Sequence, residues 1–276
     1  MKYIVENFAS IRDLIKSNET RQFNNIFSDP SKRASNKSDS GFSGTKSYEE
    51  AVELLKSGYA EPLDKIKRGV EANLRENTTK KTRVKNDIVG YAPCVPNAIL
   101  GIPQSMINKE NAAKKSKIIT ITHDSTAACY VTKEEFIKAG IVTLTIVNSL
   151  EANGYRVELK VVFNHSREGN EKIFASVTLK DWRQPLDLKK MCFPFCHPSM
   201  LRRIGFRYTE TQPQIKNSGW SWGYGRSEVS ARGYYTLLDE LRQNHLIKEN
   251  EKYINLDLCK ENQYDPQRII KACGLE

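Results

Sequence analysis

The residues with the clearest chemical potential follow a predicted strand, KIITIT at 117–122. This β-branched run is typical of a buried parallel strand, and His123, Asp124, Ser125 and Thr126 come directly after it. Open α/β sheets usually bind their ligands at such strand ends. A carboxylate with neighbouring hydroxyls can hold Mg²⁺ through oxygen atoms and water, so Asp124 and Thr126 are the candidate metal residues. The alternative is that Asp124 caps its own loop by accepting backbone hydrogen bonds.

A second set of candidate ligands is Cys192, Cys196 and His197, which offer the atom types that zinc accepts. A further ligand pair at matching spacing is missing, and the flanking residues are apolar. We therefore favour buried structural thiols over a zinc site.

Three groups of residues are candidates for binding nucleic acid or another partner. They are the basic residues Lys80, Lys81, Arg83 and Lys85, the pair Arg202 and Arg203, and the loop residues Trp220, Trp222, Tyr224 and Arg226. Paired guanidinium groups suit phosphate oxygens, and exposed aromatic rings can stack on bases. The alternatives are a solvated helix face, local ion pairs and core packing of the tryptophans. Gly223 and Gly225 lack the Lys-Ser/Thr ending of a phosphate-binding loop.

Composition and charge limit the class of protein. The 276 residues include 43 basic and 33 acidic ones, so the net charge of +10 favours polyanions or acidic partners. The six cysteines show no disulfide spacing, which indicates a reducing compartment. No stretch approaches the roughly 18 apolar residues of a membrane span, and the N-terminus lacks the apolar core of a cleavable signal. We expect a soluble protein without a membrane partner.

The N-terminal half is predicted to be helical and irregular. Residues 1–20 place Phe8, Ile11, Leu14 and Ile15 at helical spacing, and the Ser-, Asn- and Lys-rich residues 28–47 suggest a flexible linker. Three further segments follow: a helix from the Ser47/Glu50 capping box to Gly58, a second helix with a basic tail over 61–85, and a packed irregular loop over 90–106.

The C-terminal half predicts an α/β domain. A helix runs from the capping box of Thr132 and Glu135 to Gly154, and strands over 155–165 and 172–180 form an antiparallel hairpin. The remaining elements are a helix over 187–206 broken by Pro194 and Pro198, a helix over 233–246, a strand over 253–259 and a helix over 265–273. We therefore predict a mostly parallel, Rossmann-like sheet flanked by helices, with a helical N-terminal region. The predicted divisions are 1–27 as a helix, 28–47 as a linker, 48–114 as a helical and irregular region, and 115–276 as the α/β domain.

Two resemblances refine these expectations. The segment from about 115 to 275 resembles the von Willebrand factor A-like family, whose metal site begins with Asp-x-Ser-x-Ser after the first strand. Asp124 matches the acid and Thr126 the first serine, but Ala128 stands where the second hydroxyl belongs, so the resemblance implies a degenerate Mg²⁺ site. A methyl group cannot coordinate a metal.

The second resemblance covers most of the chain. The strings ENFASIRDLI, FSGTKSYEEAVELLKSG, VPNAILGIPQSM, SLEANGYRVEL and HPSMLRRIGF are similar to a family of tailed-bacteriophage and prophage proteins. This resemblance implies a phage product in the host cytoplasm or the virion, without implying an activity. Because no complete catalytic motif is present, we expect a non-enzymatic module whose strand-end loops bind a phage or host protein. The alternative is a nucleic-acid-binding protein, with or without enzyme activity, that uses the basic and aromatic residues.

Overall fold

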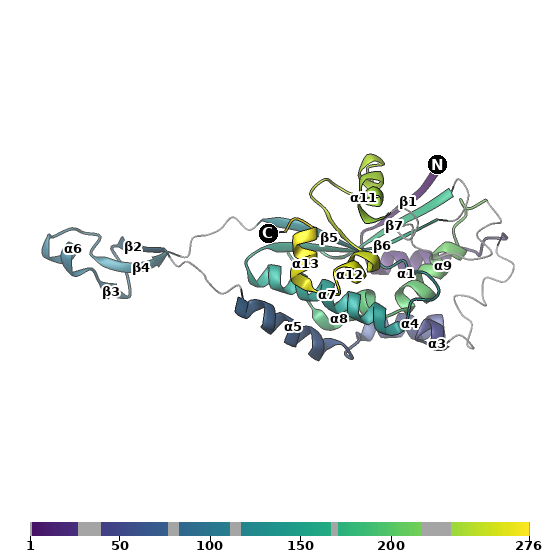
Figure 1. The fold of residues 1–276 in the computed structure, drawn as a ribbon, viewed down its shortest axis with the longest axis horizontal. Helices are drawn as coiled ribbons and strands as arrows, with labels where there is room; N and C mark the ends of the chain where they lie inside the picture. The colour runs from purple at the N-terminus through teal and green to yellow at the C-terminus, as the bar shows by residue number, and fades with distance from the viewer. Residues whose placement is uncertain are drawn as a thin grey trace.

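The computed structural model describes residues 2–26, 40–76, 83–110, 117–166, 171–216 and 233–275. Its main body is α/β, with a mixed, mostly parallel five-stranded sheet flanked by helices (Figure 1). The strands of this sheet are β1 (Lys2–Phe8), β5 (Ile118–Asp124), β6 (Arg156–Ser166), β7 (Glu171–Lys180) and β8 (Lys252–Ile254). The predicted fold class is confirmed at this level.

The sheet has the strand order β1-β7-β6-β5-β8. The hairpin partners β6 and β7 are antiparallel, as predicted, while β5 runs parallel to both β6 and β8. In this register Asp124 lies opposite Val162, and His123 lies opposite Ile254. The carboxyl ends of β5, β6 and β8 therefore meet at one edge of the sheet.

Helices cover both faces of the sheet, with α7, α8, α5 and α4 on one side and α11 on the other (Figure 1). The helices of the body are α1 (Ile11–Thr20), α3 (Ser40–Ser43), α4 (Tyr48–Ser57), α5 (Leu63–Glu76), α7 (Lys133–Ala152), α8 (Leu188–Cys196), α9 (Phe206–Glu210), α11 (Tyr234–Gln243), α12 (Leu256–Glu261) and α13 (Pro266–Ala272), with a π-helical turn η2 (Met200–Gly205). Among the described residues, none of the helices has the length and apolarity needed to cross a bilayer.

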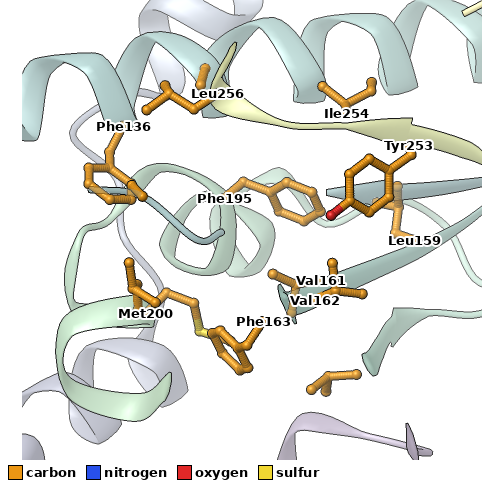
Figure 2. Packing of buried hydrophobic residues seen from close by; sticks show 14 of the residues in the cluster. Phe136, Leu159, Val161, Val162, Phe163, Phe195, Met200, Tyr253, Ile254 and Leu256 are labelled. Atoms are coloured by element: carbon orange, nitrogen blue, oxygen red, sulfur yellow. The ribbon is translucent and has the colours of Figure 1, made fainter. Parts of the chain in front are cut away.

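The central helix α7 begins at the predicted capping box. The Thr132 hydroxyl accepts from the Glu135 amide, and the Glu135 carboxylate accepts from the Thr132 amide. The helix is buried along most of its length between the sheet and its neighbours α5 and α8. Figure 2 shows Phe136 of α7 and Phe195 of α8 in the core with Val161 of β6 and Tyr253 of β8.

The N-terminal region is not wholly helical, which corrects the prediction for residues 1–20. The first seven described residues form β1, which extends the sheet by pairing in parallel with β7. Ile4 and Phe8 are both buried, with the even spacing of one strand face. The helix α1 starts only after Ser10. Ser10 is its N-cap, because its hydroxyl accepts a hydrogen bond from the Asp13 amide. The predicted domain boundary at residue 115 therefore falls within one sheet, with β1 before it and the other four strands after it.

The predicted linker is also corrected in part. Residues 28–39 lie outside the described part of the chain, but 40–47 are packed against the body. Ser43 and Thr45 are buried, and the Ser199 hydroxyl donates to the Ser43 carbonyl at 2.6 Å. Residues 40–47 are therefore part of the body and do not belong to a linker.

Two C-terminal predictions need smaller corrections. Pro194 lies inside α8 without ending it, and the helix stops at Cys196, where His197 takes the extended backbone expected before Pro198. The predicted strand over 253–259 ends at Ile254, because the side chain of Asn255 accepts from the Leu258 amide and starts α12.

A second, three-stranded sheet lies apart from the body in Figure 1. Its elements are β2 (Arg83–Asp87), β3 (Ala92–Pro93), α6 (Val95–Ile99) and β4 (Met106–Glu110). Both β2 and β3 pair with β4, and none of the three strands joins the main sheet. We call residues 83–110 the arm. Its structure corrects the predicted packed loop over 90–106, because many apolar side chains of this segment are exposed.

Candidate functional site

The strand ends bring three polar side chains together: Asp124 from β5, Asn164 from β6 and Tyr253 from β8. The Tyr253 hydroxyl donates to Asp124 Oδ2 at 2.6 Å and accepts from Asn164 Nδ2 at 3.3 Å. All three residues are buried. Sequence reasoning finds Asp124 but misses its two partners, because nothing local links a tyrosine to an aspartate 129 positions earlier.

Thr126 holds the other oxygen of the Asp124 carboxylate. Its backbone amide donates to Asp124 Oδ1 at 2.8 Å, and its hydroxyl oxygen lies 2.5 Å from the same atom. Burial raises the pKa of Asp124 to about 6, against the hydrogen bonds from Thr126 and Tyr253, which lower it. Asp124 thus performs the loop-capping role that was the alternative to a metal site.

The two residues of the predicted metal site lie side by side, but Thr126 is hydrogen-bonded to the Asp124 carboxylate. Both carboxylate oxygens of Asp124 already accept hydrogen bonds, and the loop from Asp124 to Ala128 is buried. Within the described residues, no group of three or more His, Cys, Asp or Glu side chains is arranged to hold a metal ion. The role of Asp124 and Thr126 in binding Mg²⁺ stays a prediction without further support.

Two buried histidines adjoin this cluster. The Thr143 hydroxyl lies 3.2 Å from His123 Nδ1, and the Thr209 hydroxyl lies 2.9 Å from His165 Nε2. Burial lowers the pKa of His123 to about 4 and that of His165 to about 3. Both rings are therefore neutral near pH 7, and they serve as packed polar groups of the core.

The Cys192, Cys196 and His197 group is structural. Both thiols are free and buried, and burial raises the pKa of Cys196 well above its ordinary value. The His197 ring stacks on Phe193, and its Nδ1 accepts from the Ser199 amide at 3.2 Å. This agrees with the buried-thiol interpretation.

Arg202 and Arg203 are buried rather than presented to phosphate. Arg202 donates to the backbone carbonyls of Phe42 and Val131, at 2.7 and 2.6 Å, and its guanidinium lies 3.9 Å from the centre of the Phe42 ring. Arg203 donates to the Thr45 carbonyl at 2.8 Å. Both arginines fasten the 40–47 segment to the body through backbone carbonyls, and neither forms the predicted exposed phosphate corner.

The other predicted binding residues divide between the arm and segments outside the described part. Lys80 and Lys81 precede the arm and, like Trp220, Trp222, Tyr224 and Arg226, lie outside the described residues. Arg83 and Lys85 belong to β2 of the arm. The Lys85 ammonium lies 3.3 Å from the Asp87 carboxylate, and both groups are exposed.

One hollow of about 380 Å³ lies over α1, α4 and α9. Its lining includes three carboxylates, from Glu19, Glu49 and Glu53, together with Arg207. The Arg207 guanidinium stacks 3.9 Å from the centre of the Phe23 ring. Arg207 therefore packs against Phe23 in the wall of the hollow.

The arm has the largest collection of exposed apolar side chains in the described part of the chain. They are Ile88, Val89, Tyr91, Val95, Ile99, Leu100 and Ile102, with Ile99 80% and Val89 74% exposed. Exposed apolar patches of this kind mark surfaces that contact another molecule. Sequence reasoning recognised the apolar character of this segment but assigned it to the core.

Charge is distributed unevenly along this region. Residues 88–108, which we call the tip, contain no charged side chain. The flanking residues 77–87 and 109–117 carry eight basic and two acidic side chains, a net charge of +6 out of +10 for the chain. The arm therefore combines an apolar, uncharged tip with basic flanks, and it is the strongest candidate for a functional surface.

The chain belongs to the family described as domain of unknown function DUF7192, whose model matches residues 2–276. No curated protein and no solved structure matches the chain.

Proposed function

We propose that this DUF7192 member is a phage-encoded, non-enzymatic interaction module that acts in the virion or on a host system, with the arm as its contact surface. The observation that carries the proposal is the exposure of seven large apolar side chains within residues 88–102. Leaving such side chains in water is unfavourable by about 25 cal/mol per Å² of apolar surface, so covering them favours association. The strand-end loop suggested by the sequence is a poorer contact surface, because Asp124 to Ala128 are buried.

A degenerate von Willebrand A-like domain is the finer fold that we propose for the body. Its support is the order of elements: β5 ending in Asp124, the long helix α7, then β6 and the antiparallel β7. Ala128 replaces a ligand of that family's metal site, and Asp124 is bonded to Thr126 and Tyr253. In this proposal the acid serves as a structural group of a scaffold that displays the arm.

Two cysteines allow a matched test of the contact surface. Cys94 lies on the arm and is partly exposed, Cys129 lies on the body and is exposed, and the other four cysteines are buried. A benzophenone maleimide is attached to Cys94 in a Cys129→Ser protein, and to Cys129 in a Cys94→Ser protein. Each is then illuminated in an extract of phage-infected cells.

We expect discrete cross-linked products from the Cys94 probe and far fewer from the Cys129 probe. Equal labelling from the two positions would contradict the assignment of the arm, and so would an absence of any adduct at Cys94, to protein or to lipid. Mass spectrometry of the products identifies the partner.

Nucleic-acid binding is the second candidate function, because the flanks of the arm concentrate basic residues. It predicts a mobility shift with DNA or RNA at low ionic strength, weakening steeply as salt is added. Lys85→Glu, in β2 of the arm, should reduce that shift, whereas Lys190→Glu, an exposed change in α8, should not. The lack of any shift at low salt would exclude this function.

A further inference from the structure

We propose that the arm docks on an anionic lipid bilayer, with its tip entering the interface and Lys85 of β2 at the headgroups. This inference rests on the proposed function, in that the arm is the contact surface, and it names what the arm contacts. It departs from the expectation of no membrane partner, because it concerns attachment to a membrane surface by a short hairpin and not a spanning segment.

The first support is that exposed apolar side chains come from several parts of the tip. Exposed apolar side chains come from the turn after β2 (Ile88, Val89), from α6 (Val95, Ile99) and from the turn after it (Leu100). None of the 21 residues from 88 to 108 is charged. A bilayer interface can receive apolar side chains from all sides of such a tip, at a depth of roughly 5–10 Å.

The second support is the hydrogen bonding of the backbone amides in the tip. Backbone groups that enter hydrocarbon must find their partners within the protein, because lipid offers none. In the tip, the amides of Tyr91, Cys94, Ala98, Leu100, Gly101, Ile102 and Ser105 donate to carbonyls of the same arm. Pro93, Pro96 and Pro103 have no amide hydrogen. Much of the donor capacity of the tip is thus satisfied before it leaves water.

The third support is the position of the charges. Lys85 precedes Ile88 by three residues, a distance of roughly 10 Å along an extended strand. When Ile88 and Val89 reach the acyl boundary, Lys85 therefore lies near the lipid phosphates. Asp87, 3.3 Å from Lys85, is the acidic residue between it and the tip, while the sequence of residues 77–87 and 109–117 carries a net charge of +6. Each basic residue near an anionic surface strengthens binding by about fivefold.

Other occupants fit these observations less well. A second copy would bring two arms with the same basic flanks together, and like charges repel. A DNA minor groove, roughly 6 Å wide, receives one or two apolar wedges beside phosphate-binding residues, whereas this tip is wholly uncharged. A socket in a partner protein is the remaining occupant, and the experiment below distinguishes it.

The test is co-sedimentation of the full chain with vesicles of phosphatidylcholine and phosphatidylglycerol in a ratio of about 7:3, compared with phosphatidylcholine alone. We expect binding to the anionic vesicles that weakens with added salt. The double variant Ile99→Asp/Leu100→Asp should lose on the order of a hundredfold in partition coefficient, since each buried aliphatic side chain is worth about tenfold. The charge variant Lys85→Glu should lose at least about fivefold on anionic vesicles.

A matched control carries two new carboxylates at exposed aromatic positions of the body, Tyr130→Asp/Tyr235→Asp. It should bind as the wild type does, and far-UV circular dichroism verifies that every variant is folded. Failure of the wild type to prefer anionic vesicles would overturn the inference, and so would equal losses in the control and the tip variant. Discrete protein adducts from the Cys94 probe together with no vesicle binding would leave the proposed function standing and assign the arm to a protein socket.

Discussion

Replacing Asp124 by asparagine should change how the stability of this protein depends on pH. In the folded protein burial raises the pKa of Asp124 to about 6, from an ordinary value of 3.8. The folded state therefore holds this proton more tightly than the unfolded chain does. The resulting stabilisation is complete below about pH 4 and is lost as the pH rises to about 6. At about 1.4 kcal/mol per pKa unit, the full loss is about 3 kcal/mol.

Asparagine cannot ionise, but its Oδ1 can still accept the two hydrogen bonds from Thr126. The free energy of unfolding of Asp124→Asn, minus that of the wild type, should therefore rise with pH. About half of this 3 kcal/mol change in the difference occurs between roughly pH 5 and pH 8, where other carboxylates are largely ionised. The buried His123 and His165 also titrate on unfolding, but they are present in both proteins and cancel in the difference.

Urea unfolding followed by circular dichroism at several pH values, at constant ionic strength, measures this difference. Asp64→Asn, an exposed change in α5, controls for the loss of one negative charge. Parallel curves for Asp124→Asn and the wild type would refute the reasoning, and so would a difference that falls as the pH rises. Either result would mean that burial does not raise the pKa of Asp124.

Four further predictions concern the body. Tyr253→Phe removes the hydroxyl that donates to Asp124 at 2.6 Å, and should lower the free energy of unfolding by about 1.5–3 kcal/mol at neutral pH in urea titrations; a change below about 0.5 kcal/mol would contradict the bond. Thr132→Ala removes the α7 capping box and should cost about 1 kcal/mol, with Thr20→Ala, at the end of α1, as a comparison. Gly140→Ala places a methyl group against the Phe195 carbonyl and should cost about 3 kcal/mol, seen as a lower melting temperature; an unchanged melting temperature would show that α7 and α8 are not so closely packed. Adding Mg²⁺ or a chelator should leave the melting temperature unchanged, because Asp124 is already hydrogen-bonded; a rise with Mg²⁺ in the wild type but not in Asp124→Ala would instead support the metal prediction.

The central part of the fold could be predicted because its signals are local. The Thr132 capping box, the β-branched run before Asp124 and the hairpin of β6 and β7 each depend on residues close in sequence. The strand β1 was missed because Phe8 lies at helical spacing from Ile11 and Leu14, although it belongs to a different element. Only its pairing with β7, more than 160 residues away, makes it a strand.

The site was predicted less completely for two physical reasons. The partners of Asp124 come from β6 and β8, so their positions depend on the sheet and not on spacing in the sequence. The apolar residues of the arm were expected to be buried, which holds only where the chain supplies a covering surface. For Ile99 and Leu100 the described part of this chain supplies none, and they remain largely exposed.

The claim that the arm is the contact surface can be tested most directly with an environment-sensitive fluorophore. The dye is attached to Cys94 on the arm in a Cys129→Ser protein, and to Cys129 on the body in a Cys94→Ser protein. On adding vesicles of phosphatidylcholine and phosphatidylglycerol, we expect the emission at Cys94 to shift to shorter wavelength and brighten, as the tip leaves water, while Cys129 stays unchanged. A shift at Cys129 without one at Cys94 would contradict the account. No shift at either position would overturn docking on lipid, and together with an absence of adducts at Cys94 it would contradict the assignment of the arm.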